Sequence, residues 1–326
     1  MKAGIAHVRR GASVLVVAAT FFSSSVQPSV AQTQGSRTTE PGQIERRIEK
    51  LGLRLKAGTD FELTNIDDDP RFNDYWQHYL QIMARRGVSP PAAKAIVRSR
   101  GTVVAALMVK RGEADAMLCG IVGKYNGKLK HVTDIIGIDP QVSAVSAMSV
   151  VISDKGPLFF TDTHVQNDPD ARQIAEATLQ AAFRMRLFGI TPKVALVCHS
   201  NFGSSDSASA RKMREALGMI LERSPRLEVE GEMHVDAALR PEIRERLFPD
   251  SRLTGAANLL VMPDLDAANT AYNLTRVMTD GIGIGPVLMG MAKSAHVLTP
   301  SATVRRVVNM TAIAAVDAQI REQRGA

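Results

Sequence analysis

The sequence is poor in cysteine and in aromatic residues, and both shortages exclude classes of protein. Its 326 residues include two cysteines, Cys119 and Cys198, and each stands at the end of an apolar run. Two thiols in such positions do not make a disulfide framework, and we expect both to be buried as small apolar side chains. Aromatic residues make up 5% of the chain, too few to interleave with basic side chains as in nucleic-acid-binding proteins.

The chain also lacks the glycine-rich motifs of nucleotide-binding proteins. No Walker loop of the form G-x-x-x-x-G-K-[ST] occurs. The run "GIGIGP" at residues 281–286 resembles a dinucleotide fingerprint only superficially, because it precedes an apolar strand instead of following one. We therefore expect no NADP site in this chain.

No apolar run is long enough to span a bilayer, although the N-terminus has the pattern of an export signal. Basic residues begin the chain, an apolar stretch covers residues 12–22, and small residues lead up to Ala31. This is the order of regions in a secretory signal peptide. We interpret residues 1–42 as a signal-like leader and linker. The alternative is an upstream extension that only looks like a leader, and the chemistry below favours a cytoplasmic location over export.

Strand-like and helix-like segments alternate along the rest of the chain. Length and a hydrophobic content of 45% allow about two domains with sizeable cores. The expected strands are residues 114–120, 156–163, 193–198, 257–264 and 285–290. The expected helices are residues 43–53, 71–87, 89–99, 102–112, 168–189, 207–224, 266–278 and 307–320. This alternation predicts an α/β fold with largely parallel sheets flanked by helices, in which ligands bind beyond the carboxyl ends of the strands.

The loop after the expected strand at 193–198 is the main candidate for an anion site. It reads "HSNFGSS" and leads into a helix whose first turns carry Arg211, Lys212 and Arg214. Positive charge is unfavourable at a helix N-terminus, so a negative ligand held by loop N–H groups and hydroxyls would remove the conflict. The alternative is that Asp206 or Ser207 caps the helix while the cations reach solvent. The net charge of +7 agrees with a small anionic ligand.

Two other constellations are weaker. Cys198, His199, His234 and Asp236 match no standard set of metal-ligand spacings, and we expect no metal site. Ser200 with His234 and Asp236 could imitate a hydrolase triad, but no G-x-S-x-G elbow is present.

Five segments, in order, resemble those of the phosphate acetyl/butyryltransferases. They are "RGEADAMLCG", "HSNFGSS", "EGEMHVDAAL", "ANLLVMPDLDAAN" and "GPVLMG". The resemblance implies a two-domain phosphotransacetylase-like fold with an interdomain cleft for acyl-CoA and phosphate, and a cytoplasmic homodimer. It places the first domain at residues 43–148 plus 287–326 and the second at 149–286. Family members transfer an acyl group between coenzyme A and phosphate.

The sequences of several loops are closer to those of one subgroup of the family. "HSNFGSSDS", "MHVDAAL", "FTDTHV" and "VLTPSATVRRVVNMTA" resemble the C-terminal module of bacterial multidomain malic enzymes. The resemblance implies a module that responds to acyl-CoA and contributes to assembly, separated here from the malic and NADP-binding domains. Malic enzyme activity is not expected of this chain alone.

The sequence departs from the family at the expected catalytic residues. Active members carry a Ser-Arg pair and an Asp seven residues after the Ser, and here Thr299, Pro300 and Arg306 stand at these positions. Pro300 cannot donate the hydrogen bonds that the family's arginine would donate to the thioester carbonyl. Arg306 cannot accept the thiol proton of coenzyme A as the family's aspartate would. The first hypothesis is therefore an acyl-CoA-binding module with little catalysis.

Two further hypotheses remain open, with one shared set of candidate residues. One is an active phosphate acyltransferase that uses Ser200, Thr299 and His234, and the other is an exported anion-binding protein. We expect no covalently bound cofactor. The residues expected to contact ligand are Ser200, Asn201, Gly203, Ser204, Ser205, Lys212, Asp264 and Thr299.

Overall fold

A computed structural model describes residues 4–10, 13–19 and 41–323. The chain forms two compact units, the first comprising Met1–Gly137 and Met291–Ala326 and the second Ile138–Gly290. The second unit is therefore inserted into the first. The predicted boundaries at 148/149 and 286/287 would cut one strand of the second unit at each end.

The sheet of the first unit has five strands. They are β1 (Gly4–Arg10), β2 (Ser13–Ala19), β3 (Glu62–Thr64), β4 (Ala116–Cys119) and β11 (Ser294–Val297). Their order is β11-β4-β2-β1-β3, with β2 and β11 parallel to β4 and with β1 antiparallel to both of its neighbours. The leader predicted over residues 1–31 falls partly on β1 and β2, and its remainder lies outside the described residues.

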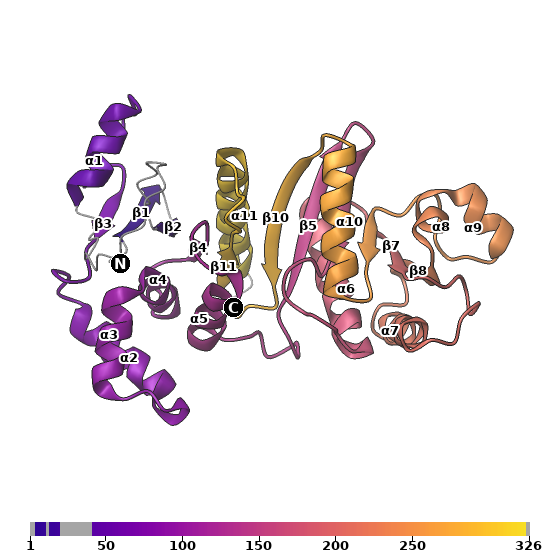
Figure 1. Ribbon diagram of the computed structural model, residues 1–326, viewed down its shortest axis with the longest axis horizontal. Coiled ribbons are helices and arrows are strands. Elements are labelled where there is room, and N and C mark those ends of the chain that lie inside the picture. Colours follow the sequence, from indigo (N-terminus) through magenta and orange to yellow (C-terminus); the bar gives the residue numbers. More distant parts are fainter. Residues whose placement is uncertain (1–3, 11–12, 20–40, 324–326) are drawn as a thin grey trace, which may run out of the picture. The chain divides into compact units, whose positions relative to one another are not determined.

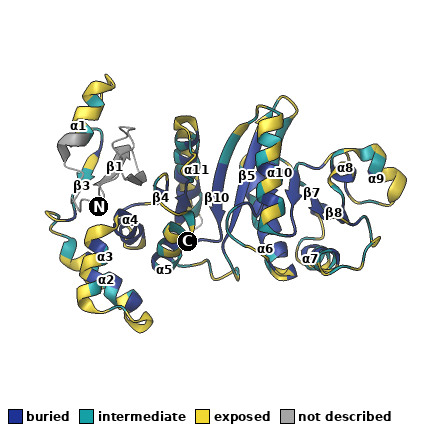
Figure 2. Cartoon of the chain, in the orientation of Figure 1, coloured by how far each residue is buried: buried dark blue, intermediate teal, exposed yellow. Residues whose placement is uncertain are grey.

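The helices of the first unit include one that is almost entirely apolar. They are α1 (Pro41–Lys50), α2 (Phe72–Met83), the short 3₁₀ helix η1 (Ala84–Arg86), α3 (Pro90–Ser99), α4 (Gly101–Lys110), α5 (Tyr125–Ile136) and α11 (Val304–Gln323) (Figure 1). Every residue of α4 except Lys110 is buried (Figure 2). A helix without a polar face is stable only inside a core. Among the described residues, no helix combines the length and hydropathy needed to cross a membrane.

The sheet of the second unit has six strands and is largely parallel. They are β5 (Ser146–Ser153), β6 (Gly156–Thr161), β7 (Lys193–Val197), β8 (Glu228–Met233), β9 (Leu259–Val261) and β10 (Ile282–Met289). Their order is β10-β5-β6-β9-β7-β8. The four neighbouring strands β6, β9, β7 and β8 are parallel to one another, whereas β5 is antiparallel to both β10 and β6. The predicted α/β class with mostly parallel sheets is confirmed, but the antiparallel β5 was not foreseen.

Helices cover both faces of this sheet. They are α6 (Ala171–Leu187), α7 (Ala208–Arg223), α8 (Val235–Leu239), α9 (Pro241–Leu247) and α10 (Leu265–Met278). One core cluster joins the sheet to α6 and α7 and includes Leu196. The other joins it to α8 and α10 and includes the next residue, Val197. Successive strand residues thus enter opposite cores, which is why these strands read as unbroken apolar runs.

Candidate functional site

The parallel strands of the second unit end at one edge of the sheet, and polar residues follow each of them. Asp162 follows β6, His199 follows β7, His234 follows β8 and Asp264 follows β9. Because the carboxyl ends of parallel strands lie at a common edge, this is where a ligand would be expected.

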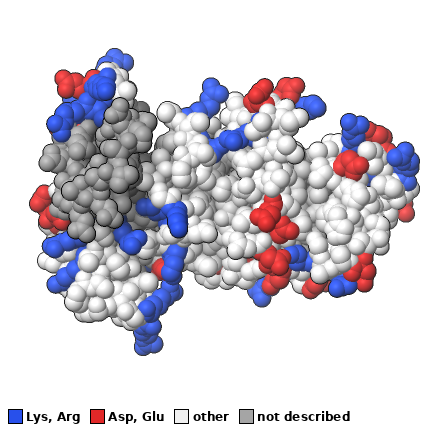
Figure 3. Space-filling model, viewed as in Figure 1, with Lys and Arg blue, Asp and Glu red and all other residues white. Residues whose placement is uncertain are grey.

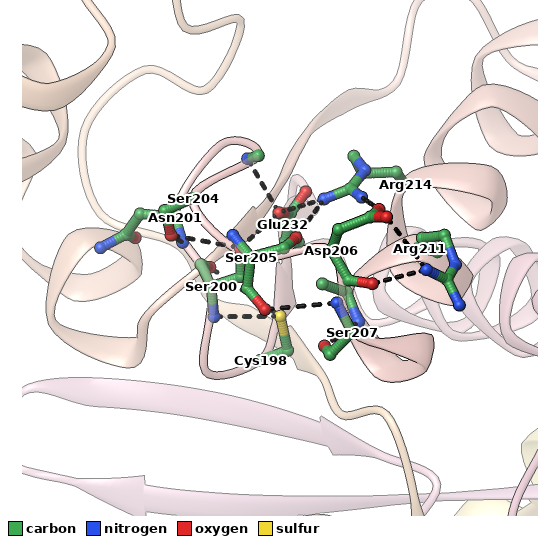
Figure 4. Close-up of polar contacts among 12 residues, drawn as sticks. Cys198, Ser200, Asn201, Ser204, Ser205, Asp206, Ser207, Arg211, Arg214 and Glu232 are labelled. Atoms are coloured by element: carbon green, nitrogen blue, oxygen red, sulfur yellow. Dashed lines mark hydrogen bonds and ion pairs between the residues drawn. The ribbon is translucent and has the colours of Figure 1, made fainter.

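The loop between β7 and α7 is folded around a buried carboxylate, Glu232 of β8 (Figure 4). Glu232 Oε1 accepts hydrogen bonds from Ser200 Oγ at 2.7 Å and from the backbone N–H of Gly203 at 2.9 Å. Arg214 Nη1 donates to the same oxygen at 2.8 Å. The side chain of Glu232 is completely buried. An acidic group of the protein itself therefore sits where the sequence suggested an anionic ligand.

The backbone N–H groups of this loop are used internally. All six amides from Ser200 to Ser205 donate within the second unit. Their acceptors, in chain order, are Cys198 Sγ, Ser204 Oγ, the backbone oxygen of Glu232, Glu232 Oε1, the backbone oxygen of Asn201 and Ser200 Oγ. Gly203 has a φ of +87°, a left-handed conformation that glycine adopts without strain. The loop N–H groups that were predicted to hold an anion are therefore already hydrogen-bonded within the protein.

The electrostatics keep Glu232 ionised. Burial raises the pKa of this carboxyl, but the hydrogen bonds from Ser200 and Gly203 and the charge of Arg214 outweigh burial, so the pKa is lowered. Arg214 also donates to the backbone oxygen of Ser205 and to Asp206, each at 3.1 Å. The guanidinium thus links the start of α7 to the loop and to β8.

The other cations at the start of α7 have internal partners as well. Arg211 pairs with Asp206 at 3.1 Å, and Lys212 pairs with Asp168 at 2.5 Å. Ser207 caps the helix, its Oγ accepting from the N–H of Ala210 at 3.2 Å. Carboxylates of the protein therefore relieve the unfavourable charge at this helix end, and the observation that motivated an anionic ligand has an explanation without one.

Sequence reasoning missed Glu232, although a signal was present. "EVEGEM" places glutamates at alternate positions of a strand whose last five residues are buried. Fully buried acidic side chains are rare unless they are paired, so such a strand indicates partners elsewhere in the fold.

A cleft of about 850 Å³ lies at the same edge of the sheet. Its walls come from the ends of β7 and β9, the starts of α7 and α8, and one side of α10. The lining residues are Val197, Cys198, His199, Ser209, Val235, Met262, Pro263, Asp264, Asp266, Ala267, Thr270, Ala271 and Leu274. The volume and the mixture of apolar walls with a few polar groups are typical of small-molecule sites.

The two acidic residues of the cleft stabilise the N-terminus of α10. Asp264 Oδ1 accepts from the N–H of Ala267 at 2.8 Å and caps the helix, and Asp266 lies in its first turn. Of the residues predicted to contact ligand, Asp264 lines the cleft directly, whereas Ser200, Asn201, Gly203, Ser204 and Ser205 form the adjoining loop.

The histidines and Asp162 have local roles. His199 Nε2 lies 3.2 Å from Ser207 Oγ, and the N–H of His234 donates to Asn201 Oδ1 at 2.8 Å. Asp162 accepts from three consecutive backbone N–H groups at residues 164–166. Burial raises the pKa of Asp162 to about 6, and these N–H groups oppose the increase. The part of the chain that the structure describes holds no group of three or more metal-ligating side chains.

The residues at the expected catalytic positions lie in the first unit. Thr299 Oγ1 is 3.0 Å from Ser301 Oγ, in the segment between β11 and α11. Arg306 lies in the first turn of α11 and is 6% exposed. The segment before Thr299 passes so close to Gly120 that a Cβ there would lie 2.1 Å from the backbone oxygen of Leu298, so only glycine fits.

Comparisons with known proteins agree on one family. Residues 31–315 match the family model described as phosphate acetyl/butaryl transferase. The chain is 53% identical over 280 residues to the NADP-dependent malic enzyme of Escherichia coli (strain K12), covering 86% of this chain and 37% of that enzyme, in its C-terminal part. It thus spans little more than a third of the malic enzymes it matches.

Relatives of similar length to this chain carry a different description. The phosphate acetyltransferase of Acetivibrio thermocellus is 31% identical over 282 residues, which covers 83% of this chain and 84% of that protein. Among solved structures, a phosphotransacetylase from Streptococcus pyogenes matches with a TM-score of 0.79 and 25% identity, covering 86% of this chain and 84% of that one.

Proposed function

Because this chain belongs to the phosphate acetyl/butaryl transferase family, we propose that it is an acyl-CoA-binding, phosphotransacetylase-like module of the malic-enzyme type with little or no transferase activity. Its chemistry would be recognition of a phosphorylated thioester, with a regulatory consequence for an associated enzyme. Oxidation of malate is not part of the proposal, since the chain spans 37% of the malic enzyme from Escherichia coli.

The observation that carries the proposal is the chemistry at Thr299, Pro300 and Arg306. Acyl transfer from coenzyme A to phosphate needs a group that accepts the thiol proton and a donor that stabilises the oxyanion. Proline has neither a side-chain donor nor a backbone N–H. Arg306 is buried, and a guanidinium carries N–H donors but no acceptor for the thiol proton. Without a positioned base the rate falls by about 10²–10⁴.

The second unit supports binding without chemistry. Its cleft is large enough for part of a coenzyme A thioester, and Cys198 and His199 of the cleft wall lead directly into the loop built on Glu232. Ser200 Oγ is completely buried and already bonded to Glu232, so it is a poor candidate for a nucleophile. Ser200 therefore holds the loop beside the cleft in place and is not available to attack a ligand.

The test combines binding and turnover on the purified full chain. Isothermal titration calorimetry with acetyl-CoA should show saturable binding, and inorganic phosphate with acetyl-CoA should give no steady-state turnover. Turnover near 1 s⁻¹ or above, the lower range of ordinary enzymes, would replace the proposal with an active transferase. No heat and no protection against thermal unfolding with millimolar acetyl-CoA would reject acyl-CoA binding.

An active phosphate acyltransferase is the second candidate. It is favoured by the match to the phosphate acetyltransferase of Acetivibrio thermocellus, 84% of which this chain covers. The residues proposed for it are Thr299, Ser200 and His234. The turnover assay separates the two candidates, because only this one predicts acetyl phosphate as a product.

A further inference from the structure

An apolar stripe lies on α1 and on the chain that leaves it. Ile44, Ile48 and Leu51 follow one another at spacings of four and three, which places them on one side of the helix. Leu51 is 68% exposed, and Leu53 and Leu55 beyond the helix are each 48% exposed. We call these five aliphatic residues the α1 stripe.

Backbone hydrogen bonds connect the two parts of the stripe at the end of α1. The N–H of Gly52 donates to the backbone oxygen of Glu49, and the N–H of Leu53 donates to the backbone oxygen of Ile48. Gly52 has a φ of +61°. This is the Schellman arrangement of a helix end. It brings the backbone of Leu53 back to the helix turn that carries Ile48, so the leucines beyond the helix continue its apolar side.

A turn fixes the other end of the exposed segment. The N–H of Lys56 donates to Asp60 Oδ2 at 2.8 Å, and the N–H of Asp60 donates back to the oxygen of Lys56 at 2.8 Å. Phe61, the next residue, is buried. Residues 51–59 are nevertheless all exposed (Figure 2). The leucines are thus presented to solvent between two hydrogen-bonded turns.

The residues around the stripe carry a positive excess. Residues 41–56 contain five basic side chains and two acidic ones, a net charge of +3. Within the part of the chain that the structure describes, Lys50, Arg54 and Lys56 form no ion pair. The space-filling view shows basic side chains gathered over α1 (Figure 3). Exposed aliphatic side chains beside lysine and arginine are typical of segments that lie on anionic membranes.

We propose that the α1 stripe binds the surface of an anionic lipid bilayer. Its aliphatic side chains would enter the boundary between headgroups and acyl chains, while the neighbouring lysines and arginines meet lipid phosphates. The helix has ten residues, too few to cross a bilayer, so the segment would lie along the surface. The contact needs no acyl-CoA, so its test stands whether or not acyl-CoA binding is found.

The composition of the stripe favours lipid over a protein partner. Residues 41–59 contain no aromatic side chain. Protein interfaces rely on tryptophan and tyrosine near their centres, and leucine is under-represented among their strongest contacts. Aliphatic side chains spread over a short helix and an extended segment suit a fluid surface, which has no fixed shape to match.

A second exposed apolar stripe lacks the charge. Val304 and Val308 of α11 are 82% and 61% exposed, as much as the leucines of the α1 stripe or more. Residues 304–316 carry two arginines, one of them buried. Exposure is therefore matched between the two stripes whereas the basic flank is not, so α11 provides the control.

The experiment is flotation of the purified full chain with lipid vesicles. The wild type should float with phosphatidylcholine vesicles that contain about 30% phosphatidylglycerol, but not with phosphatidylcholine alone, and about 0.5 M NaCl should release it. Leu53→Asp should lower the partition coefficient roughly tenfold or more, and Arg54→Glu with Lys56→Glu by a similar factor. Val308→Asp should bind as the wild type does. Because all these positions are exposed, the variants should unfold at the wild-type temperature.

A fluorescent label provides an independent readout. The native cysteines are buried, so a bimane label attaches selectively to Leu53→Cys or to Val308→Cys. Emission from the label at position 53 should shift to shorter wavelength when anionic vesicles are added, because the label leaves water. Emission from the label at position 308 should not change.

Three results would overturn the proposal. The first is a wild type that does not float with anionic vesicles. The second is flotation that none of the substitutions changes, as attachment through the apolar run at residues 12–22 would give. The third is loss of flotation in Arg54→Glu with Lys56→Glu but not in Leu53→Asp, which would leave only a contact with polyanions and reject insertion into lipid.

Discussion

The carboxylate of Glu232 is predicted to be the largest single polar contribution to the stability of the β7–α7 loop. The perturbation is Glu232→Gln, which keeps the shape and one acceptor oxygen but removes the charge. The wild-type oxygen Oε1 accepts from Ser200, Gly203 and Arg214 at 2.7–2.9 Å. The substitution therefore weakens three hydrogen bonds without creating a cavity.

The magnitude follows from the difference between charged and neutral acceptors. A hydrogen bond to a charged group contributes about 1.5–3 kcal/mol and a neutral one about 0.5–1.5 kcal/mol, so three bonds together lose about 3 kcal/mol. Arg214 is 34% exposed, and solvent screening reduces its share. We expect a loss of about 2–3 kcal/mol in the free energy of unfolding.

The assay is urea unfolding followed by circular dichroism, repeated across pH. Hydrogen bonds and the charge of Arg214 hold the folded-state pKa of Glu232 below the ordinary glutamate value of 4.5. Its contribution is therefore complete above about pH 4.5 and is lost as the pH falls through the lowered folded value. The difference between wild type and Glu232→Gln should be constant from pH 8 to 5 and should shrink in more acidic buffer.

The control is Glu215→Gln on the exposed side of α7, which should change stability by less than about 0.5 kcal/mol. A loss below 1 kcal/mol for Glu232→Gln, or a difference from wild type that grows on acidification, would contradict the assignment of this carboxylate as the ionised centre of the loop.

Three further predictions concern other parts of the molecule. Arg244 is completely buried and donates to the backbone oxygens of residues 237, 253 and 255, so Arg244→Lys should cost about 2–4 kcal/mol in urea unfolding, because one ammonium group cannot replace the planar fork. Ala271→Leu adds a side chain to the cleft wall and should weaken acetyl-CoA binding at least tenfold by calorimetry, with unchanged unfolding; unaltered affinity would place the ligand elsewhere. The triple change Thr299→Ser, Pro300→Arg and Arg306→Asp should raise acetyl phosphate formation by about 10² or more, and a rate equal to wild type would show that these positions do not limit catalysis.

Many of the helices were readable from the sequence because their signals are local, whereas α5, α8 and α9 were not predicted. Residues 168–189 predicted a helix that the structure places at Ala171–Leu187, with a capping box from Asp170 and Gln173 at its start. The chain leaves this helix at Gly189, which has a φ of +74°. Caps and glycine stops act within a few residues, so no knowledge of the tertiary fold is needed to find them.

The missed elements depend on partners that are distant in the chain. β8 carries Glu230 and Glu232 in buried positions, where Glu230 accepts from the backbone N–H of Arg252 and Glu232 Oε1 accepts from the loop after β7. Judged from the local sequence pattern alone, such a segment is classified as polar and not as a buried strand. The same limit applies to the candidate site: residue types indicated an anion at the start of α7, but only the fold shows that Glu232, Asp206 and Asp168 supply it.

The order in which the chain enters its two units has a consequence for synthesis on the ribosome. β11 pairs with β4, yet it begins about 175 residues after β4 ends, which at about 5–20 residues per second leaves β4 without that neighbour for roughly 9–35 s. The inserted unit is continuous from Ile138 to Gly290 and has all its strands before β11 emerges. The nascent chain, with one strand edge open, is therefore the stage at which chaperones or aggregation have the best access to this protein.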